Sequence, residues 1–300
     1  MDAVKVALVK ALLCFCALLP LGLARALGRG AARLYFLLGG RSRRVTLRNL
    51  ELAYPQMKAP QRRRLARESL AATGALIAEM GHVWLRPWQQ LSSLLLQVDG
   101  AELIDKARAE GRAVVVLVPH LGNWEVLGLH LATLGPTVSL YQPPKLAGLG
   151  PLIERGRQRS GAQLVPTDRS GLVRLSRALA AGDITGLLPD QVPASLGAGE
   201  NAAFMGVPCF TATLASKLIK RHHAVAVVAF AQRVRGGFHL HYRAASPDIY
   251  DEDMARSLAA LNADVEESVH CCPEQYQWEY KRFRVRPRLG PDVYDDEGLT

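Results

Sequence analysis

A histidine and a carboxylate follow an apolar stretch of the chain. His120 and Glu125 come directly after residues 113–118, which read Ala-Val-Val-Val-Leu-Val. Such a run, rich in β-branched residues, predicts a strand that is covered on both faces, and strands of this kind belong mostly to parallel sheets. Ligands of open α/β sheets bind at the carboxyl ends of strands. We therefore expect the two side chains at the mouth of a binding site.

The spacing of the pair requires a bend between its members. Positions five apart on a continuous helix point about 140° away from each other. Asn123 is a favourable N-cap, so we expect His120 in the loop and Glu125 in the first helical turn, from which it reaches the imidazole. A carboxylate that holds one imidazole nitrogen leaves the other to take a proton from a hydroxyl, which is general-base catalysis. A helix cap and a surface polar group also fit these two residues.

The motif around the pair resembles a known one. Residues 120–125, His-Leu-Gly-Asn-Trp-Glu, resemble the signature of the lipid A biosynthesis acyltransferases, the lauroyl/myristoyltransferase family. Further segments resemble the other motifs of this family in the same order along nearly the whole chain: 43–55, 157–161, 189–191, 204–206, and 273–278 with 282–283. Met205 departs from the pattern, because members often have a second phenylalanine there. That departure concerns the shape of the acyl pocket rather than the chemistry.

The resemblance implies roles for further residues. Arg157 and Arg159 lie in the arginine motif, and the planar fork of Arg157 is expected to stabilise negative charge or to place a phosphate. Asp190 is expected to position groups around the reaction centre. Amides near Gly122 and Asn123, at the start of the helix, are expected to stabilise an oxyanion. Without the resemblance, Arg157 also fits an exposed helix arginine, and Asp190 a loop cap.

The order of apolar runs and helical patterns predicts an α/β fold. We expect a single mixed, mostly parallel sheet flanked by helices, and the resemblance implies a glycerol-phosphate acyltransferase-like architecture. A chain of 300 residues can hold one large domain. We therefore divide it into an N-terminal membrane anchor, 1–40, and an acyltransferase domain, 41–300. Strands are expected at 113–118, 137–141, 163–165, 184–188, 224–231 and 238–242, and helices at 61–84, 102–109, 124–134, 152–159, 172–180, 211–221 and 252–269.

The N-terminal segment predicts membrane contact. Residues 11–24 are apolar throughout, and Lys5 and Lys10 precede them, but Pro20 and Gly22 interrupt the core. Extended back to residue 3, the segment has roughly the 20 residues that a bilayer requires, so a spanning helix and an interfacial one are both open. We favour an uncleaved membrane-anchoring helix over a signal peptide or a buried first helix. Arginines at 25, 29, 33, 41, 43, 44 and 48 outnumber the two lysines, which predicts the cell inner membrane with the catalytic domain facing the cytoplasm.

The composition narrows the choice of partners. A net charge of +10 attracts anions such as lipid headgroups, phosphorylated glycolipids and an acidic carrier protein. The sequence has no Cys/His zinc pattern, helix-turn-helix pattern or aromatic-basic strand motif, so nucleic acid is not expected. The five cysteines are odd in number and show no spaced framework, as in a reducing compartment. We expect neither a metal nor another cofactor.

The resulting hypothesis is an acyltransferase of lipopolysaccharide biosynthesis. It moves a fatty acyl chain from acyl carrier protein to a hydroxyl of a Kdo-lipid A precursor, with His120 as the base and Glu125 supporting the imidazolium. One alternative keeps the enzyme class but changes the acceptor to a glycerophospholipid, an amino-acid lipid or another glycolipid. Another is a catalytically silent membrane protein that binds lipid or carrier protein.

Overall fold

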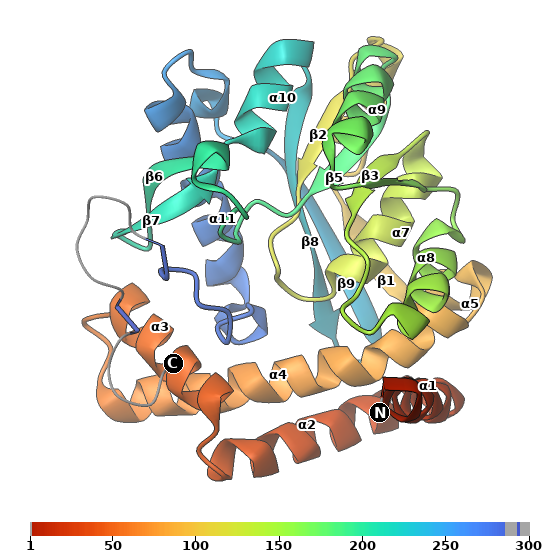
Figure 1. The fold of residues 1–300 in the computed structure, drawn as a ribbon, viewed down its shortest axis with the longest axis vertical. Coiled ribbons are helices and arrows are strands. Elements are labelled where there is room, and N and C mark those ends of the chain that lie inside the picture. The colour runs from red at the N-terminus through yellow and green to blue at the C-terminus, as the bar shows by residue number, and fades with distance from the viewer. Residues whose placement is uncertain (1, 286–292, 295–300) are drawn as a thin grey trace.

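A five-stranded sheet forms the centre of the molecule (Figure 1). The computed structural model describes residues 2–285 and 293–294. The strand order is β1-β9-β8-β2-β5, and β2 runs parallel to both of its neighbours, while the β8–β9 pair is antiparallel and β1 is parallel to β9. The mixed, mostly parallel sheet is therefore confirmed. Its strands are β1 (Leu95–Asp99), β2 (Val114–Leu117), β5 (Ile184–Leu187), β8 (Val225–Val234) and β9 (Gly237–Ala244).

Two smaller sheets stand beside the central one. The strands β3 (Val138–Tyr141) and β4 (Gln163–Pro166) pair in parallel, and β6 (Gly199–Phe204) and β7 (Val207–Ala212) form an antiparallel hairpin. The prediction of one single sheet was therefore wrong. The sequence pattern also missed β1, β6 and β7, because β1 is mostly exposed and β6 includes glycine, glutamate and asparagine rather than an apolar run.

Helices cover both faces of the central sheet, as predicted. Val114 and Val116 of β2 pack with α6 (Glu102–Ala109) and α7 (Trp124–Leu134). Val115 and Leu117 pack on the other side with α9 (Arg169–Ala180), α10 (Leu214–His222) and α11 (Met254–Cys271). All four side chains are completely buried, which explains why this strand is apolar at successive positions. The remaining helices near the sheet are α5 (Trp88–Ser92) and α8 (Gly150–Gln158).

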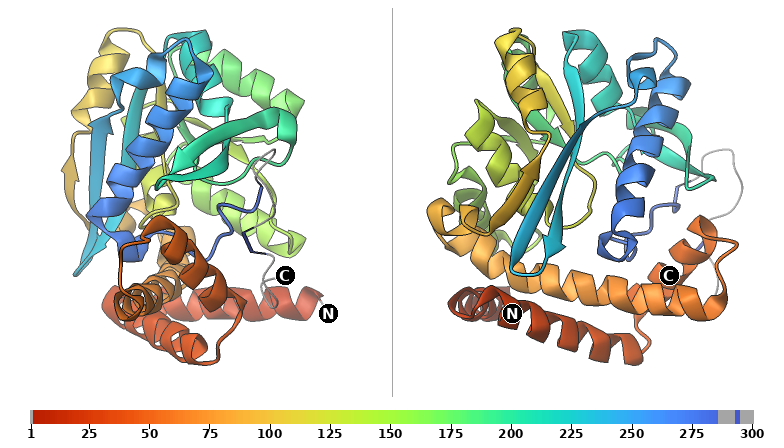
Figure 2. Two further views of the ribbon diagram at one scale, coloured as in Figure 1. Left: turned by 90° about the vertical axis from the view of Figure 1, so that its left-hand side faces the viewer. Right: turned by 180° about the vertical axis from the view of Figure 1, so that it is seen from behind.

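The N-terminal helices form a base beneath the sheet. The long helix α4 (Ala59–Leu85) crosses under its lower end, and α2 (Leu21–Leu37) runs along the far side of α4 (Figure 2). Gly28 and Gly74 bring these two helices together, since a Cβ on either would lie 2.2 Å from the carbonyl oxygen of the other. The base is completed by α1 (Asp2–Leu18) and α3 (Arg41–Ala53). Residues 2–40 thus pack on the rest of the chain, and the division at residue 40 falls in the turn before α3.

Of the two forms of membrane contact left open for the N-terminal segment, a spanning helix is not found. Among the described residues, no helix has the length and apolar character needed to cross a bilayer. The apolar stretch is divided at Pro20 into two helices of 17 residues each, and the second carries Arg25, Arg29 and Arg33. Proline lacks the N–H that a continuous helix requires, and arginines are costly inside hydrocarbon.

Candidate active site

The loop after β2 is held tightly against the end of β8. Gly122 has a φ of +62°, and a Cβ there would lie 1.9 Å from the carbonyl oxygen of Ala231. Only glycine combines this backbone angle with so close an approach. Asn123 caps α7, since its Oδ1 accepts a hydrogen bond from the amide of Val126 at 3.1 Å. The predicted loop, cap and helix start are therefore confirmed, and the loop lies between the carboxyl end of the sheet and α4.

The imidazole of His120 is bound by Asp190, which follows β5. Its Nδ1 lies 2.8 Å from Oδ1 of Asp190, and its main-chain N–H donates to Oδ2 at 2.8 Å. Two contacts from one carboxylate fix both the backbone and the ring. With Nδ1–H donating to Asp190, the lone pair of Nε2 is left for a proton acceptor role. We expected Glu125 to supply the carboxylate that binds the imidazole, but Asp190 supplies it.

Asp190 stays ionised although it is buried. Only 2% of its surface is exposed. Burial by itself raises the pKa of Asp190, but the charge of His120, the hydrogen bonds from its ring and amide, and the charge of Arg282 outweigh burial, so the pKa lies below its ordinary value. An ionised carboxylate at Nδ1 stabilises a positive charge on the imidazole, which is what a general base acquires.

Glu125 is bound by other partners. Its carboxylate accepts two hydrogen bonds from Arg157, one of them from Nε at 2.9 Å, and a third from the indole N–H of Trp84 at 3.1 Å. Within the described chain it makes no hydrogen bond to His120, so the orienting contact predicted for it is wrong. Burial lowers the pKa of the Arg157 guanidinium, but the charge of Glu125 and its hydrogen bond outweigh burial, so the pKa is raised above its ordinary value. Arg157 also lies over the ring of Tyr141, 5.4 Å from its centroid.

The amides of Gly122 and Asn123 are occupied. The first donates to the carbonyl oxygen of Gln275 at 3.1 Å and the second to that of Ala231 at 2.8 Å. These two N–H groups are therefore not free to bind an oxyanion in this conformation. The next two amides, those of Trp124 and Glu125, have no acceptor among the residues that the structure describes, as expected in the first turn of a helix.

Arg159 lies outside the site. Its Nε donates to the carbonyl oxygen of Gly156 at 3.0 Å, and its Nη2 binds that of Trp84. It does not line the cavities at His120. The side chain joins the end of α8 to the end of α4.

Two cavities meet at His120, and His120, Trp124, Glu125 and Arg157 line both. The inner pocket has a volume of about 180 Å³ and extends between α7 and the strands β3, β4 and β5. Its further walls are mostly apolar: Val118, Gly128, Leu129, Leu131, Ser139, Leu140, Ala162, Leu164, Gly186 and Leu188. The outer cleft has a volume of about 480 Å³, and it is bounded by α4, Tyr141, Gln142, Pro144, Ile153, Gln191 and Gln277. Nε2 of His120 thus stands where the inner pocket opens into the larger outer cleft.

Gln191 occupies the free nitrogen of the imidazole. Its amide nitrogen lies 3.0 Å from Nε2 of His120 and donates to Oε1 of Gln277 at 3.1 Å. Neither glutamine was predicted to have a role, although both belong to segments that resemble motifs of the family. Gln191 is next to Asp190 in the sequence and Gln277 is next to Trp278, and these neighbours in family motifs could have indicated both glutamines.

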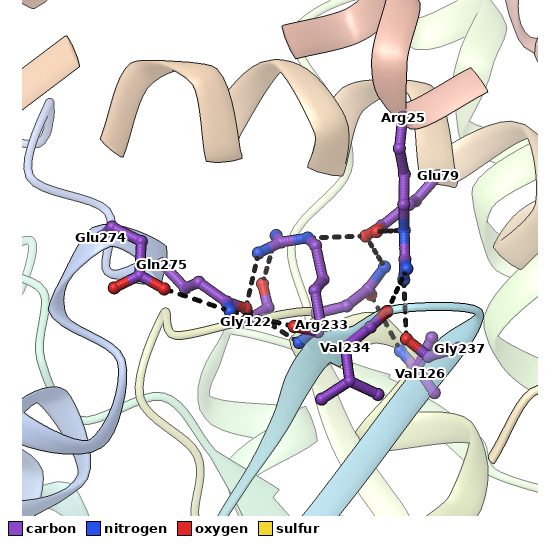
Figure 3. A network of polar contacts seen from close by, with 10 residues as sticks. Arg25, Glu79, Gly122, Val126, Arg233, Val234, Gly237, Glu274 and Gln275 are labelled. Carbon is purple, nitrogen blue, oxygen red and sulfur yellow. Dashed lines mark hydrogen bonds and ion pairs between the residues drawn. The ribbon is translucent and has the colours of Figure 1, made fainter. Parts of the chain in front are cut away.

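A buried carboxylate beneath the loop joins four elements (Figure 3). Glu79 of α4 is completely buried and accepts hydrogen bonds from Arg25 at 2.6 Å, Arg233 at 2.9 Å and Asn123 at 2.7 Å. Arg233 also donates to the carbonyl oxygen of Gly122 at 2.7 Å. The His120 loop, α2 and the β8–β9 hairpin are thereby fixed to one carboxylate. No sequence pattern reveals this network, because the three partners of Glu79 lie 44 to 154 residues from it along the chain.

A separate group with metal-ligating side chains lies on β1 and β9. Ligand atoms of Asp99, His239 and His241 lie within 4.8 Å of one another. Nε2 of His239 already pairs with Asp99 at 2.6 Å. None of the three lines either cavity at His120, so the group belongs to the sheet edge rather than to the site.

Comparison with known proteins agrees with the motifs. The family model described as bacterial lipid A biosynthesis acyltransferase matches residues 2–285. The chain is 26% identical over 288 residues to a lipid A biosynthesis lauroyltransferase of Escherichia coli (strain K12), with 92% of this chain and 90% of that protein covered. It is 26% identical over 246 residues to a palmitoleoyltransferase of the same organism, with 81% and 79% covered. A lipid A biosynthesis acyltransferase of Haemophilus influenzae is 28% identical over 311 residues, with 97% and 92% covered. The protein is an acyltransferase and belongs to the bacterial lipid A biosynthesis acyltransferase family.

Proposed function

We propose that this acyltransferase moves a fatty acyl chain from the thioester of acyl carrier protein to a hydroxyl of a Kdo-lipid A precursor. The observation that carries the proposal is the position of His120 at the junction of two cavities, with Asp190 bound to its Nδ1. The family relation supports the same reaction class. The narrow inner pocket suits an acyl chain, and the larger outer cleft, with Arg157, Gln191 and Gln277 among its walls, suits a phosphorylated sugar.

The reaction begins at Nε2 of His120. The acceptor hydroxyl replaces the amide of Gln191 there and gives its proton to Nε2 as its oxygen attacks the thioester carbonyl carbon. Asp190 stabilises the imidazolium that forms. As the tetrahedral intermediate collapses, the C–S bond breaks, and the proton passes from His120 to the departing thiolate.

The start of α7 supplies electrostatic stabilisation. The amides of Trp124 and Glu125 have no acceptor within the described residues, and their N–H groups stand at the positive end of the helix dipole. In our proposal they bind the oxyanion in place of the occupied amides of Gly122 and Asn123. The ring of Trp124 lies edge-on to that of His120 with 4.9 Å between centroids, which keeps this start next to the base.

Donor and acceptor enter from different sides in this proposal. The inner pocket takes the acyl chain, because its walls are mostly aliphatic. The outer cleft takes the sugar and its phosphates, beside Arg157 and the glutamines. Acyl carrier protein and the precursor are both anionic, and a net charge of +10 favours their approach.

The N-terminal helices provide the membrane contact. Large exposed apolar side chains gather on α1 and α2: Val4, Leu8, Leu12, Phe15, Leu18, Leu23, Leu27, Leu34, Tyr35 and Leu37. An apolar helix surface accompanied by Lys5, Lys10, Arg29 and Arg33 is typical of interfacial helices on anionic membranes. We place the protein on the cytoplasmic side of the inner membrane, where carrier-bound acyl chains and the precursor meet.

Acyl transfer by the purified protein tests this function. The full chain is supplied in detergent with acyl carrier protein thioesters of several chain lengths and with Kdo-lipid A precursor, and the products are identified by mass spectrometry. We expect a precursor with one added acyl chain and a loss of at least about 10²-fold in the His120→Ala variant. A wild-type protein that acylates phosphatidylglycerol or an amino-acid lipid instead would overturn the acceptor. Equal rates in wild type and His120→Ala would overturn the mechanism.

A further inference from the structure

A third cavity lies among the N-terminal helices, away from the base His120. It is a groove of about 470 Å³ between α1, α2 and α4. Its walls are mainly apolar, and they include Phe15 of α1, Ala31 of α2 and Leu70 of α4. Glycines and alanines on α2 and α4 provide the room, because larger side chains there would fill the space between the helices. The groove opens on the surface that carries the exposed apolar side chains.

One carboxyl group in this apolar groove lacks a full set of partners. Oε1 of Glu279 accepts a hydrogen bond from the hydroxyl of Thr73 at 2.9 Å. Oε2 is buried and has no hydrogen-bond partner within the described chain. A buried polar oxygen without a partner is costly, and membrane hydrocarbon offers it none. The groove therefore has one position at which a ligand with a polar group gains a hydrogen bond.

The electrostatics of Glu279 define the kind of polar group. Burial is the largest influence on its carboxyl and raises the pKa of Glu279. The unpartnered Oε2 accepts a hydrogen bond whether or not the carboxyl is ionised. A hydroxyl or an amide N–H can donate that hydrogen bond, whereas the esters of a phospholipid only accept.

The groove adjoins the outer cleft of the active site. Thr73 and Ile77 of α4 line both cavities, so a lipid whose chain lies in the groove has its head directed toward His120. The occupant must therefore be long and apolar, carry a hydroxyl or amide near its polar end, and present a head group to the cleft.

We propose that the groove binds one hydroxyacyl chain of the acceptor lipid, with Glu279 hydrogen-bonded to the hydroxyl or amide of that chain. This inference rests on the proposed function, because it assigns a subsite to the same acceptor. It makes Glu279 a binding residue that recognises acceptor, while the donor chain occupies the inner pocket.

Photolabelling tests the location of the chain. The full protein is bound to vesicles of phosphatidylethanolamine and phosphatidylglycerol that contain Kdo-lipid A precursor with a diazirine on a hydroxyacyl chain. Illumination followed by peptide mass spectrometry is expected to place the label on α2 and α4 at the groove. Labelling confined to the outer cleft would overturn the proposal. Equal labelling of the groove by diazirine phosphatidylethanolamine would also overturn it, because the site would then take any lipid chain.

Matched variants test the two parts of the groove. Ala31→Trp fills it, whereas Ala26→Trp adds the same side chain to an exposed position of α2 outside it. We expect Ala31→Trp to raise the KM for acceptor at least about tenfold, with kcat and the KM for donor unchanged, and Ala26→Trp to behave as wild type. Thermal melting shows whether each variant is folded. Equal acceptor KM values in the two folded tryptophan variants would overturn the proposal.

The carboxyl is tested by a conservative pair. Glu279→Met removes the polar group, and Glu279→Gln retains a donor and an acceptor. We expect Glu279→Met to raise the acceptor KM about tenfold and Glu279→Gln to remain near wild type, since one neutral hydrogen bond has about this effect. Equal KM values in both variants would remove Glu279 from the proposal.

The readouts separate this inference from the proposed function. If the groove is labelled but wild type transfers no acyl group to the precursor, the proposed function fails and the lipid site stands. If transfer occurs but the groove remains unlabelled and Ala31→Trp has the acceptor KM of wild type, the groove proposal fails alone.

Discussion

The imidazole of His120 receives its carboxylate from Asp190, which lies 70 residues further along the chain. Asp190→Asn keeps the size of the side chain but removes the charge that stabilises an imidazolium. We expect a loss of about 10²-fold or more in kcat, measured with acyl carrier protein thioester and precursor at saturation. Glu125→Gln weakens the pair with Arg157 instead, so it should lower kcat less and change KM more. A Glu125→Gln variant that loses as much kcat as Asp190→Asn at an unchanged KM would contradict this division of roles.

A substitution at a single residue, Gly128, can also test whether the inner pocket binds the acyl chain. It lines the inner pocket, and a Cβ added there would meet no atom within 4 Å. Gly128→Leu should therefore enter the pocket without disturbing its walls and exclude the ends of long acyl chains. Each methylene of the acyl chain that can no longer be buried in the pocket costs about 0.8 kcal/mol, which lowers kcat/KM roughly fourfold.

The measurement is kcat/KM for a series of thioesters of increasing chain length. Gly30→Leu is the control, because Gly30 on α2 also has open space but lies outside the pocket. A uniform loss over all chain lengths in Gly128→Leu would show that the substitution damages α7 rather than the pocket.

At the scale of elements, Glu79 holds α2, α4, the catalytic loop and the β8–β9 hairpin together. Glu79→Gln leaves Arg25 and Arg233 as neighbouring buried cations without their carboxylate. We expect a loss of about 3–5 kcal/mol in the free energy of unfolding, since breaking a buried ion pair leaves an uncompensated charge. Denaturant unfolding in detergent measures it. Glu68 is also on α4 and forms an exposed pair with Arg33 of α2. Glu68→Gln should therefore lower the free energy of unfolding by less than about 1 kcal/mol. Equal losses in the two variants would contradict a special role for Glu79.

The elements that the sequence predicted are those with continuous apolar or periodic patterns. The strand at 113–118 and the helices at 102–109 and 124–134 agree with β2, α6 and α7 within a residue at each end. The exposed edge strand β1 and the hairpin β6–β7 lack such patterns, so they were missed. The loop with His120 and its cap at Asn123 depend on neighbours in the chain and were predictable. The partner of His120 depends on how β5 packs beside β2, and local spacing does not contain that information.

At the scale of the whole molecule, the apolar surface of α1 and α2 should decide where the protein binds. Leu23 and Leu34 are 47% and 63% exposed on α2 and lie outside the groove. Replacing both with aspartate should reduce binding to phosphatidylglycerol-containing vesicles at least about tenfold, since each buried leucine contributes about 1.5–3 kcal/mol. Vesicle flotation measures the bound fraction. The control is a double aspartate variant at Leu172 and Val173, which are exposed on α9. Equal losses in both variants would contradict a membrane surface at α2.

The contacts of Arg25 also bear on how this enzyme can be shortened. Arg25 lies in the segment that a crystallographer would remove to obtain a water-soluble catalytic fragment, yet it binds Glu79 and the carbonyl oxygens of Val234 and Gly237. A chain that starts at residue 41 would expose the apolar side of α4 and leave Glu79 with one arginine instead of two. Trimming would therefore loosen the turn that supports the His120 loop. The helices that we propose to contact the membrane also hold this loop in place, so a soluble active fragment requires redesign of α4 as well as removal of α1 and α2.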